Sequence, residues 1–216
     1  MKIRIKNYFV IVAALFVLSA CNQSPIRIAC VGDSITEGAG IKFQNVNAYP
    51  AYLDSLLGDD YCVLNSGKGG TTLQSEGDFS YWNTKEFSNM FNFEPDIVIL
   101  KLGTNDTKPQ NWNEERFSAD YQLLIDTILT MKNRPEIIIC KPVPVFATRW
   151  GINDSILVNG VIPTIEKIAL KNNLKLIDLN TPFKNDNDLF PDDIHPNEHG
   201  TLKMAEIIAN FIHNVK

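Results

Sequence analysis

The chain has 216 residues, of which 44% are hydrophobic and 21% are charged, so we expect one globular domain with a substantial core and exclude extensive disorder. Twenty basic residues stand against 25 acidic residues, which gives a formal net charge of −5. A negative net charge argues against a polyanionic partner such as nucleic acid.

The first twenty residues have the pattern of a secretory signal peptide. Lys2, Arg4 and Lys6 precede an uncharged apolar run over residues 8–20. That run is shorter than the roughly 20 residues that a membrane-spanning helix needs. The pattern therefore favours a cleaved signal peptide over residues 1–20, and an uncleaved membrane anchor is the alternative.

The residues that end this run, Leu18-Ser19-Ala20-Cys21, resemble the bacterial lipobox. The resemblance implies that Cys21 becomes the lipidated first residue of an exported lipoprotein, which faces the periplasm or the cell surface. The lipid on Cys21 is then the only expected link to a membrane. Cleavage would remove three of 20 basic residues and no acidic residue, leaving 17 against 25 and a net charge near −8.

After a short tether over residues 21–25, strand-like and helix-like segments alternate throughout residues 26–216. Apolar strand-like runs occupy residues 26–31, 61–65, 96–102, 136–142 and 174–179. Amphipathic helical patterns occupy residues 48–57, 117–131, 155–171 and 198–212. This alternation predicts an α/β fold with three α/β/α layers around a flavodoxin-like, five-stranded parallel sheet whose strands are buried on both faces.

Three cysteines, Cys30, Cys62 and Cys140, lie within or at the edge of the apolar strand-like runs. If Cys21, the fourth cysteine, carries lipid, the number that remains is odd, and the sequence contains no Cys-x-x-Cys pair. We therefore expect three buried free thiols rather than a zinc or redox centre.

Polar side chains follow four of the predicted strands. The first strand is followed by GDSITEG (residues 32–38) and the second leads into NSGKGGTT (65–72). The third is followed by GTND (103–106), and the last by PDDIHPNEHG (191–200). Because ligands of open parallel sheets bind beyond the carboxyl ends of the strands, we expect these four segments to meet at one rim.

A serine hydroxyl is a weak nucleophile that needs an adjacent base, and the base needs a third group to orient it. Ser34 is a candidate nucleophile and His195 a candidate base. Pro196 disfavours a helical conformation at His195 and keeps it on a loop, from which Asp192 or Asp193 could reach the imidazole. Taken alone, the first segment would favour a helix N-cap at Ser34, but the three later segments favour the nucleophile.

The four segments, in this order, resemble the SGNH subgroup of the GDSL esterase/lipase family, whose usual GDSL reads GDSI here. The resemblance implies the SGNH hydrolase fold, with Ser34 as nucleophile, His195 as base and, of the two neighbouring aspartates, Asp192 as the orienting acid. It also implies that Gly70 and Asn105 donate hydrogen bonds to the oxyanion together with the Ser34 backbone. No cofactor is implied.

Two other kinds of site are excluded by spacing. Lys68, in the glycine-rich segment, is followed by glycine where a phosphate-binding loop requires Ser or Thr. His195 and His199 are four residues apart, but Pro196 stands where the zinc-protease motif requires glutamate, so we expect no metal site. His213, near the C-terminus, is expected to be a solvated helix-end residue.

The three tryptophans, Trp82, Trp112 and Trp150, each follow a strand end, and Trp150 stands beside Arg149. We expect these four residues to bind the substrate. A rim of flat aromatic faces suits a sugar ring, whereas a long acyl chain needs a deep aliphatic groove. Tryptophans that merely cover the edges of the core are the alternative.

The segment GTNDTKPQNW (residues 103–112) is similar to sialate O-acetylesterase-like and other carbohydrate-deacetylating members of the family. We therefore expect a serine esterase that removes acetyl groups from carbohydrates. A lysophospholipase or thioesterase acting on lipids, and a non-catalytic glycan-binding lipoprotein, are the alternatives.

Overall fold

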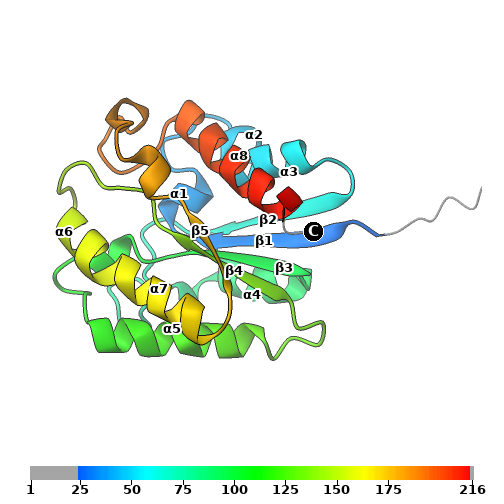
Figure 1. The fold of residues 1–216 in the computed structure, drawn as a ribbon, viewed down its shortest axis with the longest axis horizontal. Helices are drawn as coiled ribbons and strands as arrows, with labels where there is room; N and C mark the ends of the chain where they lie inside the picture. Colours follow the sequence, from blue (N-terminus) through cyan, green and yellow to red (C-terminus); the bar gives the residue numbers. More distant parts are fainter. Residues whose placement is uncertain (1–23, 215–216) are drawn as a thin grey trace, which may run out of the picture.

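The computed structural model describes residues 24–214. Its strands form one parallel sheet in the order β2-β1-β3-β4-β5 (Figure 1). The strands are β1 (Ile26–Gly32), β2 (Tyr61–Gly67), β3 (Ile97–Lys101), β4 (Glu136–Lys141) and β5 (Lys175–Asp178). This order is that of flavodoxin-like doubly wound sheets, so the predicted α/β architecture is confirmed.

Helices cover both faces of the sheet (Figure 1). One face carries α3 (Tyr49–Leu57) and α8 (Glu198–Asn214), and the other carries α4 (Lys85–Phe93), α5 (Glu114–Ile128) and α7 (Ile162–Lys171). The short helices are α1 (Ser34–Glu37), α2 (Gln44–Asn47) and α6 (Asp154–Ile156). Single turns are η1 (Tyr81–Asn83), η2 (Asn105–Thr107), η3 (Leu157–Val161), η4 (Thr181–Phe183) and η5 (Asn187–Leu189).

Alternate residues of each strand supply the two cores. On β1, Ala29 and Val31 belong to the core beneath α4, α5 and α7, whereas Ile28 and Cys30 belong to the core beneath α3 and α8. All four side chains are fully buried. The two-residue period of a strand therefore explains why the middle of β1 is apolar at successive positions.

Two helical segments differ from the sequence-based expectation. The predicted helix over residues 155–171 contains a π-helical turn at Leu157–Val161, between α6 and α7. Helix α4 was not predicted, although Phe87, Met90 and Phe91 have the i, i+3, i+4 spacing of a helix that packs on a core; of its residues, only Met90 is fully buried. Its start is defined by Thr84, whose side chain accepts a hydrogen bond from the Phe87 N–H at 3.2 Å.

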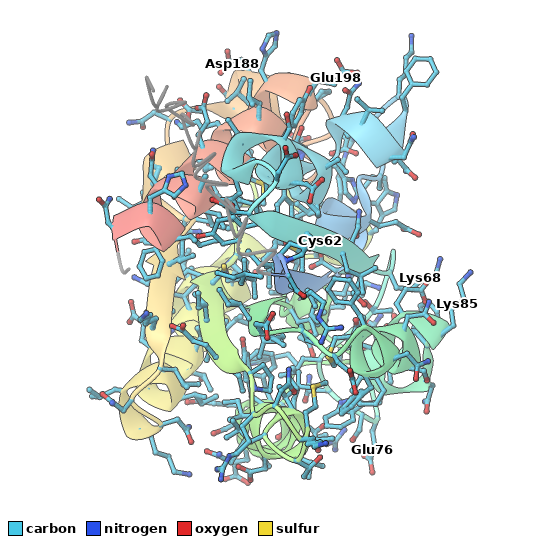
Figure 2. The ribbon with its side chains drawn as sticks, turned by 90° about the vertical axis from the view of Figure 1, so that its right-hand side faces the viewer. Cys62, Lys68, Glu76, Lys85, Asp188 and Glu198 are labelled. Carbon is cyan, nitrogen blue, oxygen red and sulfur yellow. The ribbon has the colours of Figure 1, made fainter. Side chains whose placement is uncertain are left out.

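The expectation of three buried thiols is correct for Cys30 and Cys140 and wrong for Cys62. Burial raises the pKa of the Cys140 thiol to about 12. Cys62 lies on β2, an edge strand, and its side chain is exposed on the face turned toward the viewer in Figure 2. Because β2 has a neighbouring strand on one side only, its middle residues are less completely covered than those of the central strands.

The carboxyl ends of the strands point toward the side of the molecule where α1 and α6 lie, and β1 begins at the opposite side (Figure 1). The predicted signal peptide and Cys21 lie outside the described residues. Between residues 24 and 214, no helix is long and apolar enough to cross a membrane.

Candidate active site

Ser34 is the first residue of α1 and follows β1 after a tight turn. A side chain at Gly32 would collide with Thr36, which explains the glycine. The N-cap of α1 is Asp33, whose Oδ1 accepts a hydrogen bond from the Ile35 N–H at 3.0 Å. The capping role is therefore filled by Asp33, and the Ser34 hydroxyl is left for another partner.

That partner is His195. Its Nε2 lies 2.9 Å from Ser34 Oγ, and its Nδ1 lies 2.8 Å from Asp192 Oδ2. The other Asp192 oxygen accepts hydrogen bonds from the backbone N–H groups of Ile194 and His195, at 3.0 and 2.7 Å. Burial by itself would raise the pKa of Asp192, but these N–H groups and the imidazole together hold the pKa below its ordinary value. The carboxylate is thus kept ionised and directed at the imidazole.

Asp193, the other acid within reach in the sequence, faces Arg149 instead. Its backbone φ is 68°, and its Oδ2 lies 3.7 Å from Arg149 Nε. Arg149 Nη1 also donates to the Asp192 carbonyl oxygen at 3.5 Å. Arg149, predicted as a substrate-binding residue, therefore contacts the loop that carries Asp192.

Gly70 and Asn105 reach the same site from two other strand ends. Gly70 has a φ of +80°, in the left-handed region that favours glycine. Asn105 is almost completely buried, and its Nδ2 donates to the Thr71 carbonyl oxygen at 3.0 Å. A primary amide has two N–H groups, so this bond leaves the second one for another acceptor. The Asn105 side chain thus bonds a segment 34 residues earlier rather than its own turn.

Asp106, which was not among the candidate residues, fixes the segment after Gly70. Its two carboxylate oxygens accept hydrogen bonds from the backbone N–H groups of Leu73 and Gln74, both at 2.9 Å. The side chain is fully buried, and burial raises its pKa to about 6 against the opposing effect of these bonds. In the sequence, only its position beside Asn105 indicated a role for Asp106. Its hydrogen-bond partners lie more than 30 residues earlier in the chain.

A pocket of about 300 Å³ brings these groups together. It is lined by Ser34, Ala39, Gly70, Asn105, Lys108, Trp150, Ile152 and His195. The Lys108 ammonium forms an ion pair with Asp78, whose Oδ2 lies 3.0 Å from Lys108 Nζ. A larger groove of about 680 Å³ lies beside β2 and contains none of the predicted catalytic side chains.

Of the three tryptophans, Trp150 lines this pocket. The centres of the Trp150 and His195 rings are 5.7 Å apart, and 62% of Trp150 is exposed. Trp150 also has a positive φ of 51°, and the Arg149 guanidinium lies 5.9 Å from its ring centre. An exposed indole face therefore stands beside the imidazole.

The other two tryptophans pack against the core, so the expected rim of three rings is reduced to Trp150. Trp82 Nε1 donates to the Leu73 carbonyl oxygen at 2.9 Å. The Trp112 ring packs against Phe117 and lies on Gly160, where a methyl group would come within 2.5 Å of the ring. The alternative, that tryptophans cover core edges, describes these two residues.

The remaining histidines lie outside the pocket. His199 and His213 are both exposed on α8, and His213 is in its last turn, as expected. In the part of the chain from residue 24 to 214, no three His, Cys, Asp or Glu side chains are grouped so as to hold a metal ion.

A serine beside an imidazole and a carboxylate, at the carboxyl edge of a doubly wound sheet, is an arrangement typical of α/β serine hydrolases. Comparison with known families agrees with this class. The GDSL-like lipase/acylhydrolase family is matched over residues 30–201. The chain belongs to this family of ester-hydrolysing enzymes, which confirms the family resemblance noted in its sequence.

A curated relative, the acetylxylan esterase of Xylanibacter ruminicola, is 38% identical over an alignment that covers 90% of this chain and 45% of the relative. The chain thus spans about half the length of that relative.

Several solved structures share the fold. An acetyl xylan esterase superposes with a TM-score of 0.69 at 23% identity, over 87% of this chain and 100% of that chain. A carbohydrate acetylesterase from Sinorhizobium meliloti gives a TM-score of 0.72 at 16% identity, over 88% and 100% of the two chains. A two-domain esterase active on acetylated mannans gives a TM-score of 0.67 at 24% identity, over 89% of this chain and 49% of that chain.

Proposed function

We propose that this protein is a serine esterase that hydrolyses carboxylic esters by two-step acyl transfer, with Ser34 as nucleophile, His195 as general base and Asp192 as the orienting acid. One observation carries the proposal: Ser34 Oγ, the two imidazole nitrogens and Asp192 Oδ2 form an unbroken series of contacts of 2.9 and 2.8 Å. Such a series is what a serine needs to become an effective nucleophile at neutral pH.

In the first step, His195 Nε2 accepts the Ser34 hydroxyl proton while Oγ attacks the ester carbonyl carbon. Asp192 accepts a hydrogen bond from Nδ1–H, so that Nε2 is the free base and the imidazolium is stabilised once it forms. The proton then passes to the departing alcohol oxygen, leaving an acyl group on Ser34. In the second step, water gives a proton to Nε2 and attacks the acyl carbon. The tetrahedral intermediate then collapses as the proton passes from Nε2 to Ser34 Oγ, which releases the carboxylic acid and restores the serine hydroxyl.

The negative oxygen of each tetrahedral intermediate binds to the backbone N–H groups of Ser34 and Gly70 and to the Asn105 amide. These three donors come from the ends of three different strands and border one pocket. Their positions are set before the substrate arrives, so little reorganisation is needed when charge develops on the oxygen.

The acyl group that we propose is acetyl and the alcohol is a carbohydrate. The pocket beside Ser34 has a volume of about 300 Å³, which is at the small end of the range for ligand pockets and suits a short acyl group. The exposed indole of Trp150 offers a flat face for a sugar ring next to His195. The name of the relative that is 38% identical, acetylxylan esterase, supports the same substrate class.

The test of the catalytic proposal is the loss of turnover in Ser34→Ala and His195→Ala. Each substitution should lower kcat for 4-nitrophenyl acetate by roughly 10³-fold or more, while Asp192→Ala should cost less. The matched control is His199→Ala, because His199 is exposed outside the pocket and should leave the rate unchanged. Thermal melts check that each variant folds, and a folded Ser34→Ala protein with the wild-type rate would end the hydrolase proposal.

The substrate proposal is tested with nitrophenyl esters of increasing acyl length, assayed beside acetylated xylan and deacetylated xylan. We expect the highest kcat/KM for the acetate ester and release of acetate from acetylated xylan. A preference for long acyl chains would identify a lipid acyl hydrolase instead. Binding of xylan without turnover of any ester would identify a glycan-binding protein.

We also propose that residues 1–20 are removed and that the protein is anchored outside the cytoplasm through a lipid on Cys21. The lipobox-like sequence supports this, and β1 begins at the side of the molecule opposite α1, so the pocket would face away from the anchor (Figure 1). Cys21→Ser should move the protein from the membrane fraction to the soluble exported fraction with unchanged kcat. Continued membrane association of Cys21→Ser would indicate an uncleaved helical anchor.

A further inference from the structure

The carboxylate of Glu37 joins two parts of the site that belong to different strand ends. Its Oε2 accepts a hydrogen bond from the Gly69 backbone N–H at 2.8 Å. Its Oε1 accepts one from the Lys68 ammonium at 3.1 Å (Lys68 is labelled in Figure 2). Glu37 is the last residue of α1, the helix that begins at Ser34, whereas Gly69 immediately precedes Gly70.

The glycine-rich turn lies directly against α1. A side chain at Gly67 would collide with the Glu37 backbone nitrogen, and a methyl group at Gly69 would lie 2.5 Å from Glu37 Oε2. Beyond Gly70, the same segment is held by Asn105 and by the Asp106 carboxylate. The turn is therefore fixed on both sides of Gly70, by α1 before it and by the segment after β3 beyond it.

From this geometry we propose that Glu37 is a positioning residue for the oxyanion donor at Gly70. By accepting the Gly69 N–H, Glu37 sets the direction of the next peptide N–H relative to Ser34. The inference rests on the proposed role of the Gly70 N–H in ester hydrolysis. Gly70 has no side chain that could restrain the turn, so the restraint has to come from its neighbours.

The chemistry favours a selective effect on the transition state. An oxyanion donor contributes most when it stands within hydrogen-bond distance of the charged oxygen, and a displacement of a fraction of an ångström weakens that bond. The ground-state ester carries little charge on its carbonyl oxygen and depends less on the donor. Loss of the Glu37 acceptor should therefore lower kcat and leave KM nearly unchanged.

Five variants separate position from charge and from stability. Glu37→Ala removes the acceptor, and Glu37→Asp keeps the negative charge but is one methylene too short to reach Gly69. Glu37→Gln keeps a side-chain oxygen that can accept from Gly69. Lys68→Met removes the ion pair and leaves the Gly69 bond in place. Glu86→Ala is the matched control. It removes another carboxylate whose negative charge acts on Lys68. That carboxylate is not hydrogen-bonded to the Gly69 N–H.

The rates are measured with 4-nitrophenyl acetate, and inhibition is measured with phenylboronic acid, which forms a tetrahedral adduct on a reactive serine. In Glu37→Ala and Glu37→Asp, kcat should fall about tenfold with KM within about twofold, because the displaced Gly70 N–H binds the negative oxygen of the transition state less strongly. The inhibition constant of the boronic acid should rise by a similar factor. Glu37→Gln and Lys68→Met should stay within about threefold of wild type, and Glu86→Ala should match it.

Three results would overturn the proposal: equal kcat values in Glu37→Asp and Glu37→Gln, a loss confined to KM, or a full loss reproduced by Lys68→Met. If Glu37→Ala has a melting temperature well below that of wild type, its rate is not informative about positioning. The kcat values of Glu37→Asp and Glu37→Gln then test the proposal, because both variants keep a polar side chain at this position. A Ser34→Ala protein that retains activity contradicts the proposed function itself. Wild-type kcat in Glu37→Asp, in an enzyme that Ser34→Ala inactivates, contradicts only the positioning role.

Discussion

Lys101 Nζ lies 2.8 Å from Asp33 Oδ1, and neither side chain has any exposed surface. Lys101 is the last residue of β3, and Asp33 stands between β1 and Ser34. The ion pair therefore joins two adjacent central strands directly beneath the proposed nucleophile. Burying two charges is costly, and only their mutual attraction and further hydrogen bonds offset that cost.

We predict that Lys101→Met lowers the free energy of unfolding by about 3–5 kcal/mol, because it leaves the Asp33 carboxylate buried without a cation. The double variant Lys101→Met with Asp33→Asn should recover much of the loss, since no charge remains and asparagine can still cap Ile35. Urea unfolding measures both. Lys175→Met is the control, because its ion pair with Glu136 is substantially exposed and should contribute about 0–1 kcal/mol. Equal losses in Lys101→Met and Lys175→Met would contradict this account.

The lowered pKa of Asp192 predicts a loss of stability in acid. Its pKa is lower in the folded protein than in the unfolded chain, so its contribution to the free energy of unfolding is present above the unfolded value, about 3.9, and disappears as pH falls through the folded value. The stability difference between wild type and Asp192→Asn should shrink as the pH falls below about 4. Urea unfolding at a series of pH values tests this, and a difference independent of pH would refute it.

The contribution of Asp106 to stability should change with pH in the opposite direction. Burial raises its pKa from 3.8 to about 6, so the folded state binds a proton more tightly than the unfolded chain. Relative to Asp106→Asn, the wild type should be most stable below about pH 4, lose stability as pH rises toward 6 and change little above that, by on the order of 3 kcal/mol in total. Asp33 contributes to the raised pKa through its negative charge. A stability difference that grows with pH would contradict this sign.

Asn105→Ala should lower kcat for 4-nitrophenyl acetate by roughly 10²-fold or more with little change in KM, because its amide binds best to charge that develops in the transition state. The variant also loses the bond to the Thr71 carbonyl, so its melting temperature should be measured beside the rate. If the whole effect is found in KM, Asn105 is a substrate-binding residue rather than an oxyanion donor.

Trp150→Ala should reduce activity on acetylated xylan more than on 4-nitrophenyl acetate. Loss of one stacked ring face should cost on the order of 1 kcal/mol in kcat/KM for the glycan. Trp112→Ala is the matched control: it removes a ring that packs against Phe117 and Gly160, so it should lower the melting temperature and show no preference between the two substrates. Equal losses on both substrates in Trp150→Ala would indicate that its ring does not bind sugar.

The architecture could be predicted from the sequence because each of its parts has a local signal. The strands are short, mainly apolar runs, and the fully buried apolar residues of β1 and β3 show why polar and apolar positions do not alternate along those runs. Ser34 and His195 are 161 residues apart, yet both could be placed at one rim, because the carboxyl ends of parallel strands meet at one edge. Helix α4 had a shorter signal, a single i, i+3, i+4 set at Phe87, Met90 and Phe91 within nine residues, and was missed.

Only the tertiary structure decided which side chains stand beside those residues. All three tryptophans follow strand ends, but the packing of Trp112 on Gly160 and the hydrogen bond of Trp82 to Leu73 direct two of them into the core, and Trp150 alone of the three reaches the pocket. The contact of Glu37 with Gly69 likewise joins segments 32 residues apart. Such contacts depend on how separate loops fold against one another, and no periodicity within either loop records its partner. The sequence by itself therefore determined the fold and the candidate reactive groups, whereas their supports were decided by long-range packing.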